Sequence, residues 1–219
     1  MDISPSLNAI HIWVARAAAI TGGVTLLTPL WGFRRQDRRA RAQSSGRLTH
    51  VLRWPFLLVT TFLFITAGVL LWRPIPFSLS PLWRMITLIA GSLLYFPGTA
   101  LYLWGYKTLG DNFGLSSGFG ATLYAGHRLI QSGPYRHIRH PMYLGVIFAA
   151  VGALLIFQTW AMLVFLPLSF GIIARARRED KLLEQAFGEQ WQVYERRVPG
   201  WFPGLRREHD EQVTRNKRS

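Results

Sequence analysis

Long apolar runs constrain the fold of this chain more than any other feature of its sequence. A run of about twenty apolar residues can cross a bilayer as a helix. A helix forms hydrogen bonds between its own backbone groups, which is necessary because the hydrocarbon core contains no water to bond them. Half of the 219 residues are hydrophobic and only 16% are charged. We therefore predict an all-α integral membrane protein with about five transmembrane helices, over residues 7–33, 56–72, 82–104, 142–157 and 160–173.

The last two runs are short. At a rise of about 1.5 Å per residue, residues 142–157 reach about 24 Å, against a hydrocarbon core of about 30 Å. This helix must borrow flanking residues, thin the bilayer, or form a hairpin with the next run across Gln158 and Thr159. We favour the short hairpin. Beyond it, apolar residues recur three or four apart and predict a cytoplasmic C-terminal amphipathic helix: Leu183, Phe187, Trp191, Tyr194 and Val198.

The formal net charge of +14 is spread along the chain and forms no single patch. Arginines fill the first connection, the second has two, and basic residues return in the third: Arg34, Arg35, Arg38, Arg39, Arg41, Arg47 and Arg53; Arg73 and Arg84; Lys107, Arg128, Arg136 and Arg139. The positive-inside rule then puts the N-terminus outside and the C-terminus in the cytoplasm. Nucleic acid is not an expected partner, and the dominance of arginine over lysine favours a bacterial inner membrane.

Several chemistries are disfavoured by what the sequence lacks. No cysteine is present, so disulfides, thiolate nucleophiles and cysteine metal sites are excluded. His127, His137 and His140 crowd one loop, but no acidic residue lies near them in the sequence, and we expect no metal site. A Gly-x-Ser-x-Gly elbow and a glycine-rich phosphate loop are also absent.

Polar residues gather instead at the start of the fourth run, over residues 133–145, and again after the fifth. Arg175 and Glu179 are four residues apart and share a helix face, which by itself is also typical of a solvated ion pair. A hairpin would bring both groups to one membrane surface. Cation, imidazole, phenol and carboxylate then predict a cytoplasmic pocket for a zwitterionic, ribose-bearing ligand.

Two segments in this order carry a family resemblance. Residues 133–145 read Gly-Pro-Tyr-Arg-His-Ile-Arg-His-Pro-Met-Tyr-Leu-Gly, and residues 175–199 carry a double acid before Leu-Leu, a Phe-Gly-x-x-Trp-x-x-Tyr segment and a closing Val-Pro. Over residues 109–203 the chain resembles the isoprenylcysteine carboxyl methyltransferase and phospholipid methyltransferase superfamily. The resemblance implies S-adenosylmethionine as methyl donor, bound on the cytoplasmic side.

The resemblance also implies roles for individual residues. The cofactor would be bound by Gln131, Gly133, Tyr135, His140, Pro141 and Tyr143, with Glu179 or Asp180 supplying the carboxylate. The catalytic set would be Arg139, Arg175 and Glu179, with the two arginines facing the acceptor or its developing charge. Asp180 stands where the family usually has Glu, which shortens its reach, so Glu179 is the stronger candidate.

These observations predict an integral membrane methyltransferase acting on a lipophilic carboxylate, amine or thiol, with membrane lipids as partners. Two alternatives remain open: an NADPH-dependent enzyme like the sterol reductases, which share a related C-terminal half, and a non-catalytic lipid-binding protein of the same fold. The chain is expected to divide into a three-helix part over residues 1–105, a cofactor-binding and catalytic part over 106–205, and a charged, disordered tail over 206–219.

Overall fold

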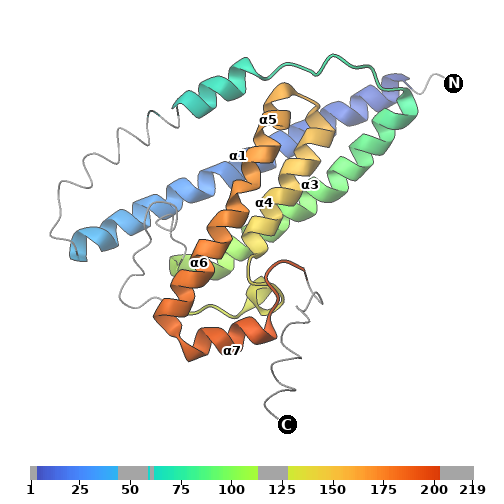
Figure 1. Ribbon diagram of the computed structural model, residues 1–219. Helices are drawn as coiled ribbons and strands as arrows, with labels where there is room; N and C mark the ends of the chain where they lie inside the picture. The colour runs from blue at the N-terminus through green and yellow to red at the C-terminus, as the bar shows by residue number, and fades with distance from the viewer. Residues whose placement is uncertain (1–3, 44–58, 60–61, 113–127, 203–219) are drawn as a thin grey trace, which may run out of the picture. The chain divides into compact units, whose positions relative to one another are not determined.

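The computed structural model describes residues 4–43, 59, 62–112 and 128–202. Within these ranges every regular element is a helix, so the all-α prediction is confirmed there, and the only pairing of strand type is an isolated bridge between Pro74 and Thr159. The elements in Figure 1 are α1 (Ser4–Gln43), a helical stretch over residues 62–70, α3 (Pro81–Leu109), α4 (Pro141–Phe157), α5 (Trp160–Ser169), α6 (Gly171–Phe187) and α7 (Glu189–Arg197), with 3₁₀ turns η1 (Gly110–Asn112) and η3 (Gly133–Arg136).

Among the described residues, three helices are long and apolar enough to cross a membrane: Pro5–Thr28 within α1, Pro81–Leu109, and Trp160–Phe187, which joins α5 to α6. The helix α4 is apolar but has only 17 residues. Five crossings therefore stay a prediction, since part of the second apolar run lies outside the described residues. Also outside them are Arg47, Arg53, His127 and the predicted tail over 206–219.

Two helix boundaries differ from the sequence-based expectation. The first helix does not end near residue 33 but continues to Gln43, because residues 34–43 contain good helix formers and no glycine or proline. The predicted C-terminal helix is two helices, α6 and α7. Gly188, between them, has a φ of 52°, a left-handed conformation that interrupts a right-handed helix.

By packing, the chain divides into two compact units, Met1–Thr99 with Val146–Gly171, and Ala100–Gly145 with Ile172–Ser219. Each unit therefore combines segments that are distant in the sequence. The first holds most of the apolar helices, and the second holds the polar loop and the C-terminal helices. The sequence-based division at residue 105 is a division along the chain, and it stays a prediction.

In the first unit, small residues let helices approach closely. A Cβ atom added to Gly152 of α4 would lie 2.5 Å from the backbone nitrogen of Tyr95 in α3. The Tyr95 hydroxyl donates a 2.6 Å hydrogen bond to the Ala18 carbonyl of α1. A ring N–H of His11 in α1 lies 2.9 Å from the Ile156 carbonyl, near the end of α4. These hydrogen bonds give the Tyr95 hydroxyl and the His11 ring partners that the hydrocarbon chains of a lipid could not provide.

The connection between α4 and α5 is two residues long, as the predicted hairpin requires. Gln158 turns the chain with a φ of 48°, and the Thr159 hydroxyl caps α5 by accepting from the Met162 amide at 3.4 Å. The preceding segment covers this turn, because the Ile75 amide donates to the Gln158 carbonyl and the Trp160 amide to the Arg73 carbonyl. The turn at the ends of α4 and α5 can be followed in Figure 1.

Candidate functional site

In the second unit, the loop before α4 has a fixed backbone. Gly133 has a φ of 57°, and a Cβ added to it would lie 2.6 Å from Thr108 Oγ1. The short η3 turn begins there, with Pro134 in its first turn. Pro141 then starts α4, a position that suits proline because the first helical amide has no intrahelical acceptor. Arg139 and His140 are thus held just before the helix, and Tyr143 in its first turn.

The chain that follows α7 returns to this loop and pairs with it. The Arg139 amide donates to the Pro199 carbonyl at 2.9 Å, and the His140 amide donates to the Gly200 carbonyl at 3.0 Å. The rings of His140 and Trp201 lie 5.4 Å apart. Two consecutive backbone bonds therefore fix the direction in which the Arg139 and His140 side chains leave the loop.

The apolar face of α7 also contacts the same loop. Trp191, Tyr194 and Val198 are buried together, as the three-and-four spacing predicts, and Leu183 and Phe187 of α6 pack against them. The Tyr194 hydroxyl donates a buried 2.7 Å hydrogen bond to the Tyr135 carbonyl. Burial raises the pKa of Tyr194, and the nearby Arg139 charge only partly opposes this. The phenol is therefore a neutral donor at physiological pH.

Tyr135 of the loop is also buried. Its pKa is raised by burial first and then by the negative charge of Glu179. Both phenols, Tyr135 and Tyr194, thus act as neutral polar groups inside the second unit.

The first polar group of the candidate site joins α4 to α6. The Tyr143 hydroxyl donates a 2.7 Å hydrogen bond to Glu179 Oε2, and the Arg175 guanidinium lies 6.0 Å from the Tyr143 ring centre. A hydrogen bond to an ionised group is stronger than a neutral one. The Glu179 carboxylate is therefore held in one place beside a cation and an aromatic face.

The second polar group is centred on Arg139. Its Nη1 donates to Asp180 Oδ2 at 3.0 Å and to Glu195 Oε1 at 2.8 Å. The guanidinium also lies 5.5 Å from the Trp191 ring centre, within the range of a cation–π contact. The exposed fraction of the Arg139 side chain is 13%, so this pairing is screened less than a surface ion pair.

His140 completes the second group. Its Nε2 lies 3.0 Å from Asp180 Oδ1, but the ring N–H is not aligned for a hydrogen bond, so the contact contributes as an ion pair only when the imidazole is protonated. Buried polar atoms normally have hydrogen-bond partners. In the described part of the chain three atoms of this group lack one, namely Arg139 Nε, His140 Nε2 and Asp180 Oδ1.

The structure thus brings together six of the predicted site residues: Arg139, His140, Tyr143, Arg175, Glu179 and Asp180. The others have different surroundings. Pro141 is buried at the start of α4, and Gly133 lies against Thr108. Gln131 is half-buried and accepts a 2.8 Å hydrogen bond from Nη2 of the exposed Arg197.

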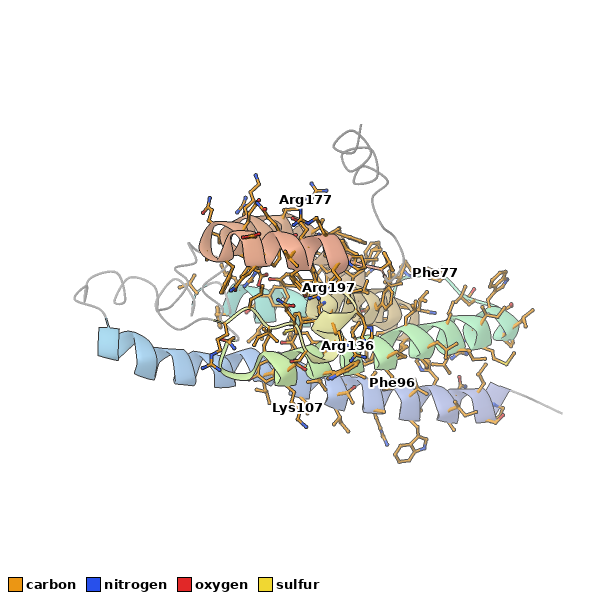
Figure 2. The ribbon with its side chains drawn as sticks, turned by 90° about the horizontal axis from the view of Figure 1, so that it is seen from below. Phe77, Phe96, Lys107, Arg136, Arg177 and Arg197 are labelled. Atoms are coloured by element: carbon orange, nitrogen blue, oxygen red, sulfur yellow. The ribbon has the colours of Figure 1, made fainter. Side chains whose placement is uncertain are left out.

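Not every arginine of α6 belongs to the site. Arg177 is exposed and points outward from the helix in Figure 2, where Arg136 and Arg197 are also labelled. Within the described ranges no group of three or more His, Cys, Asp or Glu side chains is arranged to hold a metal ion.

Sequence reasoning missed Glu195 and Tyr194 as parts of this arrangement. The spacing contained a usable signal, because Glu195 lies four residues after Trp191 and residues four apart share a helix face. Arg139 contacts both Trp191 and Glu195. The spacing places Trp191 and Glu195 on one face of α7, but only the structure shows that Arg139 is the residue they contact.

The fold and the cluster define the class of this protein: a helical membrane protein that gathers ionisable and aromatic side chains around the polar loop before α4. Residues 85–190 match the family described as phospholipid methyltransferase, which is part of the same superfamily as isoprenylcysteine carboxyl methyltransferase. The match begins within α3, earlier than residue 109 where the resemblance was placed, and it ends at residue 190, short of 203.

Two bacterial relatives are similar over part of their length. One is the cobalt-zinc-cadmium resistance protein CzcN of Cupriavidus metallidurans, 32% identical over 136 residues, which are 56% of this chain and 62% of that protein. The other is the nickel-cobalt-cadmium resistance protein NccN of Alcaligenes xylosoxydans xylosoxydans, 35% identical over 79 residues, which are 35% of this chain and 37% of that protein. The matched part of the chain therefore spans less than two thirds of either relative.

Proposed function

We propose that this protein is a membrane methyltransferase that moves a methyl group from S-adenosylmethionine to a lipophilic acceptor at the cytoplasmic membrane face. The observation that carries the proposal is the convergence of His140, Tyr143, Glu179 and Asp180 in one unit. All four lie inside the segment that matches the phospholipid methyltransferase family. A family of methyltransferases needs a methyl donor, and this cluster is where one would bind.

The chemistry of the cluster fits S-adenosylmethionine. That molecule carries a carboxylate, an ammonium group, ribose hydroxyls and a sulfonium whose methyl group it supplies when bound. Among the described residues, the donor Arg139 Nε, the ring nitrogen His140 Nε2 and the acceptor Asp180 Oδ1 are buried without a hydrogen-bond partner, although the last two lie 3.0 Å apart. The two nitrogens suit the carboxylate, and Asp180 suits the ammonium group or a ribose hydroxyl.

Methyl transfer from a sulfonium is an in-line displacement, so the protein mainly aligns the two reactants and excludes water. We assign this alignment to Glu179, which Tyr143 holds by its hydrogen bond, and to Arg175, whose guanidinium lies over the same ring. Arg139 is engaged by two carboxylates. We therefore assign it to the cofactor side, and we assign Arg175 to the acceptor side because its guanidinium lies over the Tyr143 ring, whose hydroxyl holds Glu179.

The acceptor decides whether a base is needed. A carboxylate is ionised near neutral pH and attacks without losing a proton, and Arg175 would orient it. An amine must first lose a proton, which the Glu179 carboxylate or the His140 ring would accept. The apolar helices support an acceptor that enters from the lipid, and the arginine distribution supports an N-terminus outside and a C-terminus in the cytoplasm of a bacterial inner membrane.

Isothermal calorimetry of the purified protein in detergent or nanodiscs tests the proposal. We expect S-adenosylmethionine to bind the wild type, and His140→Ala and Tyr143→Ala to bind it about tenfold or more weakly, because each removes a polar partner worth roughly 1.4 kcal/mol or more. Glu184→Gln, an exposed acid of α6 outside the cluster, is the matched control and should bind normally. Absence of binding to the wild type, with and without added lipid, would refute the proposal.

Two further measurements separate the alternatives. Incubating membranes with radiolabelled S-adenosylmethionine, and asking which lipid or small-molecule fraction gains label, identifies the acceptor. Binding of NADPH in preference to S-adenosylmethionine would favour the sterol-reductase-like reading. Cofactor binding without methyl transfer to any membrane extract would favour a non-catalytic lipid-binding protein.

We also propose a physiological setting, metal-ion tolerance, because both relatives are named as metal-resistance proteins. The chain would contribute through methyl transfer. The test is growth of a metal-sensitive bacterial strain expressing the wild type or His140→Ala on graded Co²⁺, Zn²⁺ and Cd²⁺. Tolerance conferred by the wild type alone supports the setting, and equal growth of both strains contradicts it.

A further inference from the structure

Arg139 is shared between two helices through a single nitrogen. Its Nη1 contacts Asp180 Oδ2 of α6 at 3.0 Å and Glu195 Oε1 of α7 at 2.8 Å. The Trp191 ring lies 5.5 Å from the guanidinium carbon, and the Arg139 amide is bonded to the Pro199 carbonyl. The side chain is therefore held from three directions, with one carboxylate on each of two helices.

The second oxygen of Asp180 has no hydrogen bond. Oδ2 accepts from Arg139, whereas Oδ1 lies 3.0 Å from His140 Nε2 without an aligned bond. The exposed fraction of the His140 side chain is only 5%, so water is largely excluded from that position. Two buried polar atoms thus face each other, and a ligand that bonds either of them would satisfy it.

An arginine with one carboxylate partner prefers two parallel hydrogen bonds, which use both carboxylate oxygens. If Arg139 had only Asp180, the favoured arrangement would engage Oδ1 as well as Oδ2. Nη1 instead donates to Asp180 Oδ2 and to Glu195 Oε1, so the described bonds join the guanidinium to only one oxygen of Asp180. Without Glu195, Nη1 would lose its second carboxylate and the guanidinium could turn toward the two-bond arrangement with Asp180.

We propose that Glu195 is a positioning residue for ligand binding: by sharing Arg139 Nη1 it keeps Asp180 Oδ1 free of a hydrogen bond from Arg139, so that this oxygen can accept from the ammonium group or a ribose hydroxyl of the methyl donor. The identity of that ligand rests on the proposed function. Glu195 lies beyond residue 190, where the family match ends, so the family match does not include this residue. Its exposed fraction of 43% makes its interaction with Arg139 sensitive to salt.

A double-mutant cycle tests this role. The affinity for S-adenosylmethionine is measured by calorimetry for the wild type, Glu195→Ala, Asp180→Asn and the double variant. Glu195→Ala should weaken binding about tenfold, a coupling typical of residues in one ion-pair network. In the Asp180→Asn background the same substitution should change affinity by less than about twofold, because an amide has only one oxygen and Arg139 cannot bind two oxygens of residue 180 with or without Glu195.

Two variants separate position from charge and from folding. Glu189→Ala removes an exposed acid from the first turn of the same helix and should bind within about twofold of the wild type. Glu195→Gln keeps an oxygen that can accept from Nη1 and should restore part of the affinity. In turnover measurements Glu195→Ala should raise KM and leave kcat near the wild-type value. An equal loss for Glu195→Ala in both backgrounds, or the same loss in Glu189→Ala, overturns the proposal.

A readout without ligand distinguishes failure of this proposal from failure of the proposed function. An experimental structure of Glu195→Ala should show Arg139 contacting both oxygens of Asp180. If the wild type binds no S-adenosylmethionine, the proposed function fails. The number of Asp180 oxygens that Arg139 contacts in Glu195→Ala then still shows whether Glu195 positions Arg139. If the wild type binds the methyl donor while Glu195→Ala retains both its affinity and its single contact with Asp180, only the positioning role fails.

Discussion

The Tyr143 hydroxyl donates a 2.7 Å hydrogen bond to Glu179 Oε2, joining the first turn of α4 to the middle of α6. Tyr143→Phe removes this bond without changing the ring, and Glu179→Gln removes the charge that strengthens it. A bond to a charged group contributes about 1.5–3 kcal/mol, so we expect each variant to bind S-adenosylmethionine about tenfold or more weakly. Calorimetry measures both losses.

Non-additivity is the sharper part of this prediction. Because one substitution removes this bond and the other weakens it, the double variant should lose less affinity than the sum of the two single losses. Glu184→Gln, on an exposed part of α6, serves as the control. Fully additive losses would mean that Tyr143 and Glu179 act on the ligand independently.

The close approach of α3 and α4 in the first unit predicts a strong effect at Gly152. The Cβ atom of Gly152→Ala would lie 2.5 Å from the Tyr95 amide nitrogen and 2.7 Å from the Gly91 carbonyl, and backbone atoms cannot rotate away. We expect a loss of about 1–3 kcal/mol, the usual range for overpacking. Thermal unfolding in detergent measures it. Gly23→Ala, where a Cβ meets nothing within 4 Å, should be neutral or stabilising by up to about 1 kcal/mol.

Gly133 and Gly110 separate backbone strain from steric conflict. Both have a positive φ, 57° and 49°, so alanine is strained at either position by roughly 1–2 kcal/mol. Only at Gly133 does an added Cβ also meet a neighbour, at 2.6 Å from Thr108 Oγ1. We therefore expect Gly133→Ala to lower the unfolding temperature more than Gly110→Ala does. Equal shifts would show that Thr108 moves away freely.

Buried phenols predict a loss of stability at high pH. Burial raises the pKa of Tyr194 and of Tyr135 above the ordinary tyrosine value of about 10. Above pH 10 the unfolded chain releases these protons while the folded chain keeps them, so the unfolded state binds fewer protons and the free energy of unfolding falls as pH rises. Stability contributed in this way is fully present below about pH 10.

Unfolding temperatures measured between pH 8 and 11 test this dependence. Tyr194→Phe should decline less steeply than the wild type, since one titrating group is removed. At pH 8 the same variant should already be less stable, by about 1–3 kcal/mol, because the Tyr135 carbonyl loses its buried donor. Parallel pH curves for the two proteins would contradict the assignment.

Particular residues show how far sequence reasoning reached. The turn at Gln158 and Thr159 was predicted from the length of the fourth apolar run. A helix shorter than the hydrocarbon core is accommodated by few arrangements, and a hairpin with the next helix is one of them. The burial of Trp191, Tyr194 and Val198 was predicted from spacing alone. The break at Gly188 was not, because a glycine within an amphipathic pattern is compatible with a continuous helix until neighbouring contacts decide.

The sequence by itself determined that this chain is helical, that it is apolar enough for a membrane, and that its ionisable residues lie in a loop before α4 and in the helix after α5. These properties follow from composition and periodicity, which are local. Only the tertiary structure decided that Arg139 binds Asp180 and Glu195, and that Tyr143 reaches Glu179. Periodicity fixes the face of its own helix on which a residue lies, whereas the distance between side chains of separate elements depends on how those elements pack.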